Sequence, residues 1–259
     1  LDNAKPPDRT TSPPPSAAAV SDEVASSISL LVDYHARTQE PPATAEQRAA
    51  KRDALSSLLL SECGGKFDPF ASIAYLLLGD ADVARALLAA LRDKHAAGPY
   101  LRLEPSAFEA WLPLPPTAAA DGSGHAPSAR GTLLALVEEI VAVELPEVHA
   151  AMQACGLPTA LPAARWLSTS WLNFLEWRSL TCANLLPLLL GADCHVYLCV
   201  AAMRHVGKSQ RAGAPSAALH LSMLLPLEGF DALAEMPYIL DLRQRHGARC
   251  RAALLRSTE

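Results

Sequence analysis

The chain has 259 residues, enough for one large or two small domains with a buried core. Half of its residues are hydrophobic, 19 % are charged, and the formal net charge is -5 at pH 7. This composition is globular, and without a basic stripe it argues against a nucleic-acid partner. The longest apolar runs, 55–60 and 185–190, are far shorter than the roughly 20 residues that cross a bilayer, so we expect no membrane span.

The apolar residues are mainly Ala and Leu, which favour helices, and alternating strand patterns are nearly absent. We therefore predict an all-α protein. Six cysteines without a C-x-x-C pair predict reduced thiols in an intracellular, cytoplasmic protein. Residues 1–20 are rich in Pro and predict an extended linker. Because the first residue is Leu1 instead of Met, we expect the chain to be a piece of a longer protein.

The first helices have clear start and stop signals. Asp22 begins a run with apolar residues at helical spacing, namely Val24, Ile28, Leu31 and Val32, and Pro41 ends it. Thr44 is the predicted N-cap of the next helix, with Gln47 as its capping-box partner and Gly64 as its end.

Two shorter helices follow. One spans Phe70 to Leu78, and the next is capped by Asp80 or Asp82 and has a predicted apolar face of Val83, Leu87, Leu88 and Leu91. Residues 21–112 are therefore predicted to form one helical part. Residues 113–131, rich in Pro, Ala, Gly and Ser, predict a mobile insert.

The helical period returns at Thr132. An apolar stripe comprises Leu133, Leu136, Val137, Ile140 and Val141, and Glu138 and Glu139 are predicted to oppose it. Pro146 begins a fresh helix, and Gly207 marks the predicted end of the last apolar helix of a part spanning 132–212. A helical extension over 213–259 contains predicted helices at 219–225 and from Pro237.

The order of landmarks from Leu145 to Met203 resembles the C-terminal half of a TBC domain, the helical module of Rab GTPase-activating proteins. The corresponding residues are Gly156, Trp166, Trp171, Leu185, Tyr197, Val200 and Ala201. This resemblance implies an irregular multi-helix fold. Within the family, Leu185 to Arg204 and the tail Met236 to Gln244 resemble the subgroup that joins WD repeats to a divergent TBC domain at centrosomes and cilia.

TBC catalysts carry an arginine finger in I-x-x-D-x-x-R and a glutamine finger in Y-x-Q-G. A guanidinium neutralises charge on the transferred phosphoryl group, and a carboxamide orients the attacking water. Here Arg37 follows Asp33 by four residues instead of three, which rotates it about 100° on a helix and favours a solvated Arg at a helix end. By the same resemblance Asp68 occupies the glutamine position, where a carboxylate would repel a triphosphate.

The penultimate helix of the pattern carries a third departure. Pro187 stands near the usual Trp-Asp pair. Since Pro lacks a backbone donor, we expect it within about one turn of a helix start capped by Thr181 or Asn184. A helix running unbroken from Trp177 through Pro187 would contradict this placement.

Other candidate sites are weaker. Trp171, Trp177 and Arg178 have the composition of a binding hot spot, although core packing is the preferred account of the tryptophans. Cys194, His195 and Cys199 do not have zinc-ligand spacing, and Gly207-Lys208-Ser209 lacks the first glycine of a phosphate loop. We predict no metal and no cofactor.

The resulting hypothesis is a non-catalytic, GTPase-activating-protein-like binding or scaffold module. Its partners would be proteins of a larger ciliary or centrosomal assembly, with a small Rab-type GTPase as one candidate. One alternative is an active domain that uses the shifted Arg37 or residues upstream of Leu1. Another is a purely structural helical subunit, expected to stack as regular helix pairs.

Overall fold

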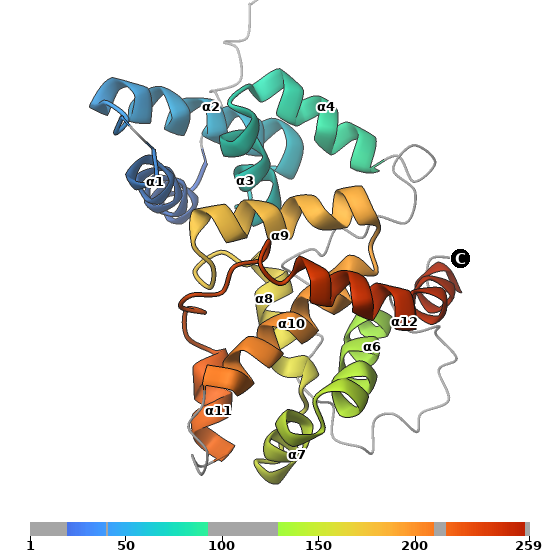
Figure 1. Cartoon of the computed structure of the whole chain (residues 1–259). Coiled ribbons are helices and arrows are strands. Elements are labelled where there is room, and N and C mark those ends of the chain that lie inside the picture. Colours follow the sequence, from blue (N-terminus) through green and yellow to red (C-terminus); the bar gives the residue numbers. More distant parts are fainter. Residues whose placement is uncertain (1–19, 40, 93–128, 210–215, 257–259) are drawn as a thin grey trace, which may run out of the picture.

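The computed structural model describes residues 20–39, 41–92, 129–209 and 216–256. Every regular element there is a helix (Figure 1), which confirms the all-α prediction. The helices are α1 (Asp22–Arg37), α2 (Ala45–Cys63), α3 (Pro69–Leu78), α4 (Ala81–Arg92), α6 (Ala129–Glu144), α7 (Pro146–Ala154), α8 (Ala160–Ser168), α9 (Trp177–Leu190), α10 (Cys194–Ser209), α11 (Ser216–Met223) and α12 (Met236–Arg256). No described helix is long and apolar enough to span a membrane. The Pro-rich segment 1–20 and the insert 113–131 lie almost wholly outside the described residues; α6 takes the last residues of the insert.

Two hydrophobic clusters divide the helices. The smaller cluster is built from α1 to α4, and the larger one from α6 to α12 together with Ile73 of α3. α10 lies at the centre of the larger cluster, since every residue from Cys194 to Met203 is buried. α9 runs between the two groups in Figure 1, and Leu172 and Trp177 pack against both clusters. The two halves therefore meet along α9 and the turn before it, since Leu188 of α9 also packs against the smaller cluster.

Several local signals form as predicted. Thr44 and Gln47 make a complete capping box at α2, and Gly64 ends that helix in the left-handed conformation. The Asp80 carboxylate accepts hydrogen bonds from the first turn of α4. The predicted apolar face of α4 was wrong at Val83, which is 51 % exposed, because Ala84 and Leu88 set the buried face instead.

The placement of Pro187 at a helix start was wrong. α9 begins at Trp177 with Glu176 as its N-cap and continues through Pro187 to Leu190. Asn184 is an interior residue of the helix, and its Nδ2 donates to the backbone oxygens of Leu180 (2.9 Å) and Ser170 (3.0 Å). Pro187 lies one turn from the C-terminal end, where Gly191 N donates to its carbonyl at 2.9 Å and ends the helix.

The prediction that Gly207 ends α10 was wrong: the helix continues through Gly207 to Ser209. A Cβ atom at Gly207 would lie 2.8 Å from Cγ2 of Val148 on α7. The glycine therefore permits close approach of two helices, a role that only the tertiary structure reveals.

Polar contacts of α6 fix two other helices. Glu138, predicted to lie opposite the apolar stripe, accepts from Thr159 Oγ1 (2.6 Å) and Ala160 N (2.8 Å) at the start of α8. Glu144 accepts from Arg245 and from His246 (2.7 Å) of α12. The Arg245 hydrogen bond is the largest cause of the lowered pKa of Glu144. A carboxylate at a helix N-terminus also complements the helix dipole.

Candidate functional site

A groove of about 360 Å³ lies between α1 and two segments that face it. One wall is α1 itself, with lining residues three or four positions apart and therefore on one helix face: Ser27, Leu30, Leu31, Tyr34 and Arg37, with Asp33 at the edge. The other wall is formed by Phe67, Leu172 and Asn173. We call this site the α1 groove.

Arg37 lies in the last turn of α1, with its side chain exposed. The position three residues after Asp33 is Ala36, which is only 6 % exposed. An arginine in the usual spacing would therefore point into the core, and the one-residue shift turns Arg37 outward into the α1 groove. Asp33 accepts from Arg52 at 2.8 Å and lies 3.7 Å from Arg48, so its charge ties α1 to α2.

Asp68 is the N-cap of α3. Its Oδ1 accepts from Ala71 N at 2.8 Å, its carbonyl accepts from Ser72 Oγ at 2.7 Å, and the residue is 9 % exposed. Because Phe67 lines the α1 groove, the fold brings the Arg37 end of α1 beside the segment that precedes α3. The two segments singled out by the resemblance thus border one groove.

Loss of the Asp68 cap should be measurable. Replacing Asp68 by Ala is expected to lower the free energy of unfolding by about 1 kcal/mol, because the N–H of Ala71 loses its partner. Asp68→Asn keeps a capping oxygen and should cost much less. Urea denaturation of both variants gives the comparison, and equal losses would contradict a capping role.

An unusual turn supplies the second wall of the groove. Ser170, Trp171 and Asn173 have φ values of 49°, 66° and 70°, a conformation that non-glycine residues adopt at a cost. Trp171 is 1 % exposed and its ring stacks on Trp166 with centroids 5.2 Å apart. Packing of this ring stabilises the turn, which places Leu172 and Asn173 at the groove. Leu172 and Asn173 were not predicted from the sequence as groove residues, since no helical or strand period marks them.

Trp171 is a core residue, which confirms the preferred account of this tryptophan and removes it from the candidate partner surface of Trp171, Trp177 and Arg178. Trp177 is half-buried, and its ring centroid lies 4.5 Å from that of His35 and 6.3 Å from that of Tyr34. Tyr34 Oη also donates to the carbonyl of Leu175 at 3.0 Å. Trp177 thus joins α9 to α1, while Arg178 beside it is exposed.

Two buried cysteines of α10 have strongly raised pKa values. Burial raises the pKa of Cys194 to about 12, with the charge of Asp193 adding to the shift, and burial raises that of Cys199 well above its ordinary value. Both thiols stay protonated and are poor nucleophiles or metal ligands. Within the described ranges, no group of three or more His, Cys, Asp or Glu side chains could hold a metal ion.

Comparison with known proteins gives a match over most of the chain. A family model described as "Broad-minded protein Rab TBC domain" matches residues 39–249. "Protein broad-minded" of Danio rerio is 31 % identical over 148 residues, which cover 54 % of this chain and 10 % of that protein. No solved structure matches. Asp68 and Trp166 lie inside the matched range, whereas α1 with Arg37 precedes it.

Proposed function

The chain belongs to the Broad-minded Rab TBC domain family, and from this premise we propose that it is a non-catalytic module whose α1 groove binds a protein. A small Rab-type GTPase is the first candidate partner. The TBC resemblance of the sequence agrees with this membership; the narrower WD-repeat subgroup stays a prediction. The matched region spans about a tenth of the length of the Danio rerio relative. Any activity or partner of the full-length protein is therefore a proposal here.

The capping role of Asp68 carries the non-catalytic proposal. Asp68 stands at the position that the resemblance assigns to the glutamine finger. Its carboxylate and its carbonyl both accept hydrogen bonds from the first turn of α3. A carboxylate also cannot donate a hydrogen bond to water or phosphate when ionised. This position therefore lacks the carboxamide that would orient an attacking water.

The lining of the α1 groove favours a protein partner. Leu30 is 71 % exposed, Phe67 and Leu172 are half-buried, and Arg37 forms no ion pair with any residue in the described part of the chain. Apolar and aromatic side chains beside an available arginine are the composition enriched at interface centres. An apolar surface that carries an acidic group would complement this groove.

The test combines binding with GTP hydrolysis for a panel of purified Rab-type GTPases loaded with GTP. We expect a partner to bind without acceleration of its intrinsic hydrolysis. Leu30→Glu should weaken binding at least about tenfold, because a charge would be desolvated in the groove. Leu189→Glu is the matched control, since Leu189 is 77 % exposed on α9 and outside the groove. Absence of binding across the panel, or equal losses in both variants, would exclude the proposed GTPase-binding groove.

An active domain that uses Arg37 is the second candidate function. It is favoured by the exposure of Arg37 in the same groove as Phe67, next to Asp68. In this case hydrolysis would accelerate strongly, Arg37→Ala would abolish the acceleration, and Arg37→Lys would restore little because lysine lacks the planar fork. That result would overturn the non-catalytic proposal.

We also propose a place for the module in a larger ciliary or centrosomal assembly, which rests on the sequence resemblance alone. Fluorescence microscopy of the tagged chain in ciliated cells tests it, and a diffuse signal would count against it. The alternative of a purely structural, solenoid-like subunit assumed that the chain does not belong to the TBC family. Family membership removes that premise, and Figure 1 does not show regular stacked helix pairs among the described helices.

A further inference from the structure

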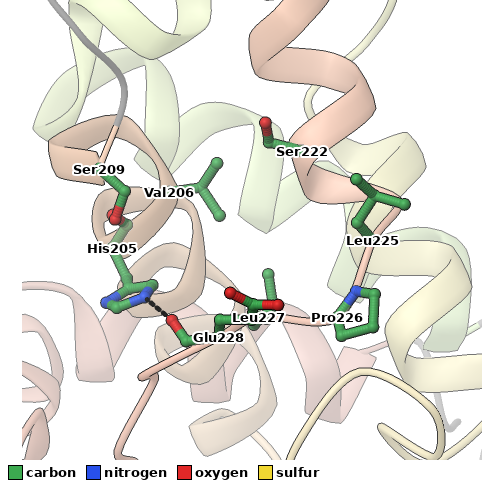
Figure 2. Close-up of a pocket in the computed structure, with 8 residues that line it drawn as sticks. All are labelled: His205, Val206, Ser209, Ser222, Leu225, Pro226, Leu227 and Glu228. Atoms are coloured by element: carbon green, nitrogen blue, oxygen red, sulfur yellow. Dashed lines mark hydrogen bonds between the residues drawn. The ribbon is translucent and has the colours of Figure 1, made fainter.

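A second pocket, of about 450 Å³, lies between the C-terminal ends of α10 and α11. Figure 2 shows Val206 and Ser209 on one side of the space, Leu225 and Pro226 on the other, and Glu228 along its lower edge. None of these residues lines the α1 groove. We call this site the α10–α11 pocket.

In the α10–α11 pocket, Nε2 of His205 and the hydroxyls of Ser209 and Ser222 are already engaged as hydrogen-bond donors. His205 Nε2 lies 2.9 Å from the backbone oxygen of Glu228, and since a carbonyl only accepts, this nitrogen donates. Ser209 Oγ donates to the carbonyl of His205 at 3.0 Å, and Ser222 Oγ donates to that of Ala218 at 2.8 Å. With its hydrogen engaged, the Ser209 hydroxyl offers only the lone pairs of its oxygen to a ligand. The polar lining therefore selects for a hydrogen-bond donor.

The charge of the pocket has the same preference. Glu228 is exposed, and its carboxylate makes no ion pair with any residue in the described ranges. Arg204, one residue before His205, is engaged elsewhere, because it lies 3.6 Å from Glu235 and its guanidinium stacks over Tyr238 at 3.8 Å. A cation is thus the ligand charge that the pocket favours.

The apolar walls suit a long aliphatic stem. Val206 is 5 % exposed and forms an inner wall, whereas Leu225 is 59 % exposed at the rim. Leu221, the residue before Ser222 in the last turn of α11, is 60 % exposed as well. Arginine and lysine side chains combine such a stem with a donor-rich cation.

We propose that the α10–α11 pocket receives an arginine or lysine side chain of a partner protein. The stem packs between Val206 and Leu225, and the cation binds the Glu228 carboxylate with the hydroxyl oxygen of Ser209 as a further acceptor. An apolar residue next to the basic one in the partner covers Leu221. This site is separate from the α1 groove, so the module would hold two proteins or two parts of one.

The test uses four acetylated, amidated pentapeptides of sequence Ala-Leu-X-Leu-Ala in which X is Arg, Lys, citrulline or Glu. Citrulline keeps the shape of arginine without its charge. NMR titration of the whole chain, followed at the methyl groups of Val206 and Leu225, reports binding at the pocket. We expect the Arg and Lys peptides to bind about tenfold more tightly than the citrulline peptide, and the Glu peptide to bind most weakly.

Glu228→Gln separates charge from shape. It should bring the Arg and citrulline peptides to equal affinity, while Glu23→Gln in the first turn of α1 should change nothing. Leu30→Glu in the α1 groove should also leave the titration unchanged, which keeps this test distinct from that of the proposed function. Equal binding of Arg and citrulline peptides to the unmodified chain, an unaffected Glu228→Gln variant, or no methyl shifts at about 10 mM peptide would each overturn the proposal.

Discussion

Replacing Trp166 by Ala is expected to lower the free energy of unfolding by about 4 kcal/mol. The ring is fully buried, stacks on Trp171 with an interplanar angle of 21°, and donates from Nε1 to the carbonyl of Met223 at 3.0 Å. Its loss would leave a large cavity and an unbonded carbonyl between α8 and the end of α11. Guanidinium denaturation followed by far-UV circular dichroism measures the change.

Trp166→Phe is the matched control for this prediction. Phenylalanine retains part of the stack but not the hydrogen bond to Met223, so we expect a loss of about 2 kcal/mol. The Ala variant should also disturb the turn at Trp171, because that positive-φ conformation depends on the same stack. A loss below 1 kcal/mol for Trp166→Ala would contradict the central position of this ring in the larger cluster.

Signals confined to one turn of helix were predictable from sequence. The capping box of Thr44 and the left-handed Gly64 formed as expected because each depends on residues within about one helical turn. The apolar stripe of α6 was also predicted correctly, since all five of its residues are buried: Leu133, Leu136, Val137, Ile140 and Val141. Its strict helical spacing leaves one face for the core.

Predictions failed where distant contacts set the local structure. Pro187 lies near the end of a helix that begins earlier than predicted, because the turn containing Trp171 ends α8 and lets α9 start at Trp177. Gly207 lets α10 approach Val148 of α7 closely, and Glu138 accepts a hydrogen bond from the backbone at the start of α8. The roles of Gly207 and Glu138 each involve a partner more than twenty residues away, and the position of Pro187 in its helix depends on a turn more than three helical turns earlier; a local pattern encodes none of these.

The α1 groove likewise combines residues that the sequence pointed to with residues that only the tertiary structure brings there. The resemblance drew attention to Arg37 and to Asp68, and the fold brings their segments to one groove. Leu172 and Asn173 lie there only because of the left-handed turn. Similarly, the acceptor-only character of the α10–α11 pocket depends on which carbonyl each hydroxyl reaches, and so could not be inferred from the order of residues.

The stability of the chain should fall as the pH drops from about 7 toward 4. Burial, with a smaller contribution from the charge of Lys51, lowers the pKa of His35 from 6.5 to about 4, and burial lowers that of His195 to about 4. The unfolded chain therefore binds more protons than the folded chain between these values. The resulting stability is fully present above pH 6.5 and is lost as the pH falls toward 4.

For His35 alone, the expected loss between pH 7.5 and 5.5 is about 1 kcal/mol. The ring lies against Trp177 and its Nε2 is 3.4 Å from Gln39 Nε2, so a proton would place a charge in the contact between α1 and α9. His35→Gln should remove this part of the pH dependence, whatever its effect at pH 7.5. Lys51→Gln should reduce it only slightly, because burial is the larger cause. Urea denaturation at several pH values gives the slope of the free energy of unfolding against pH. An unchanged slope in His35→Gln would mean that His35 binds a proton equally well in the folded and unfolded chains, which would contradict this prediction.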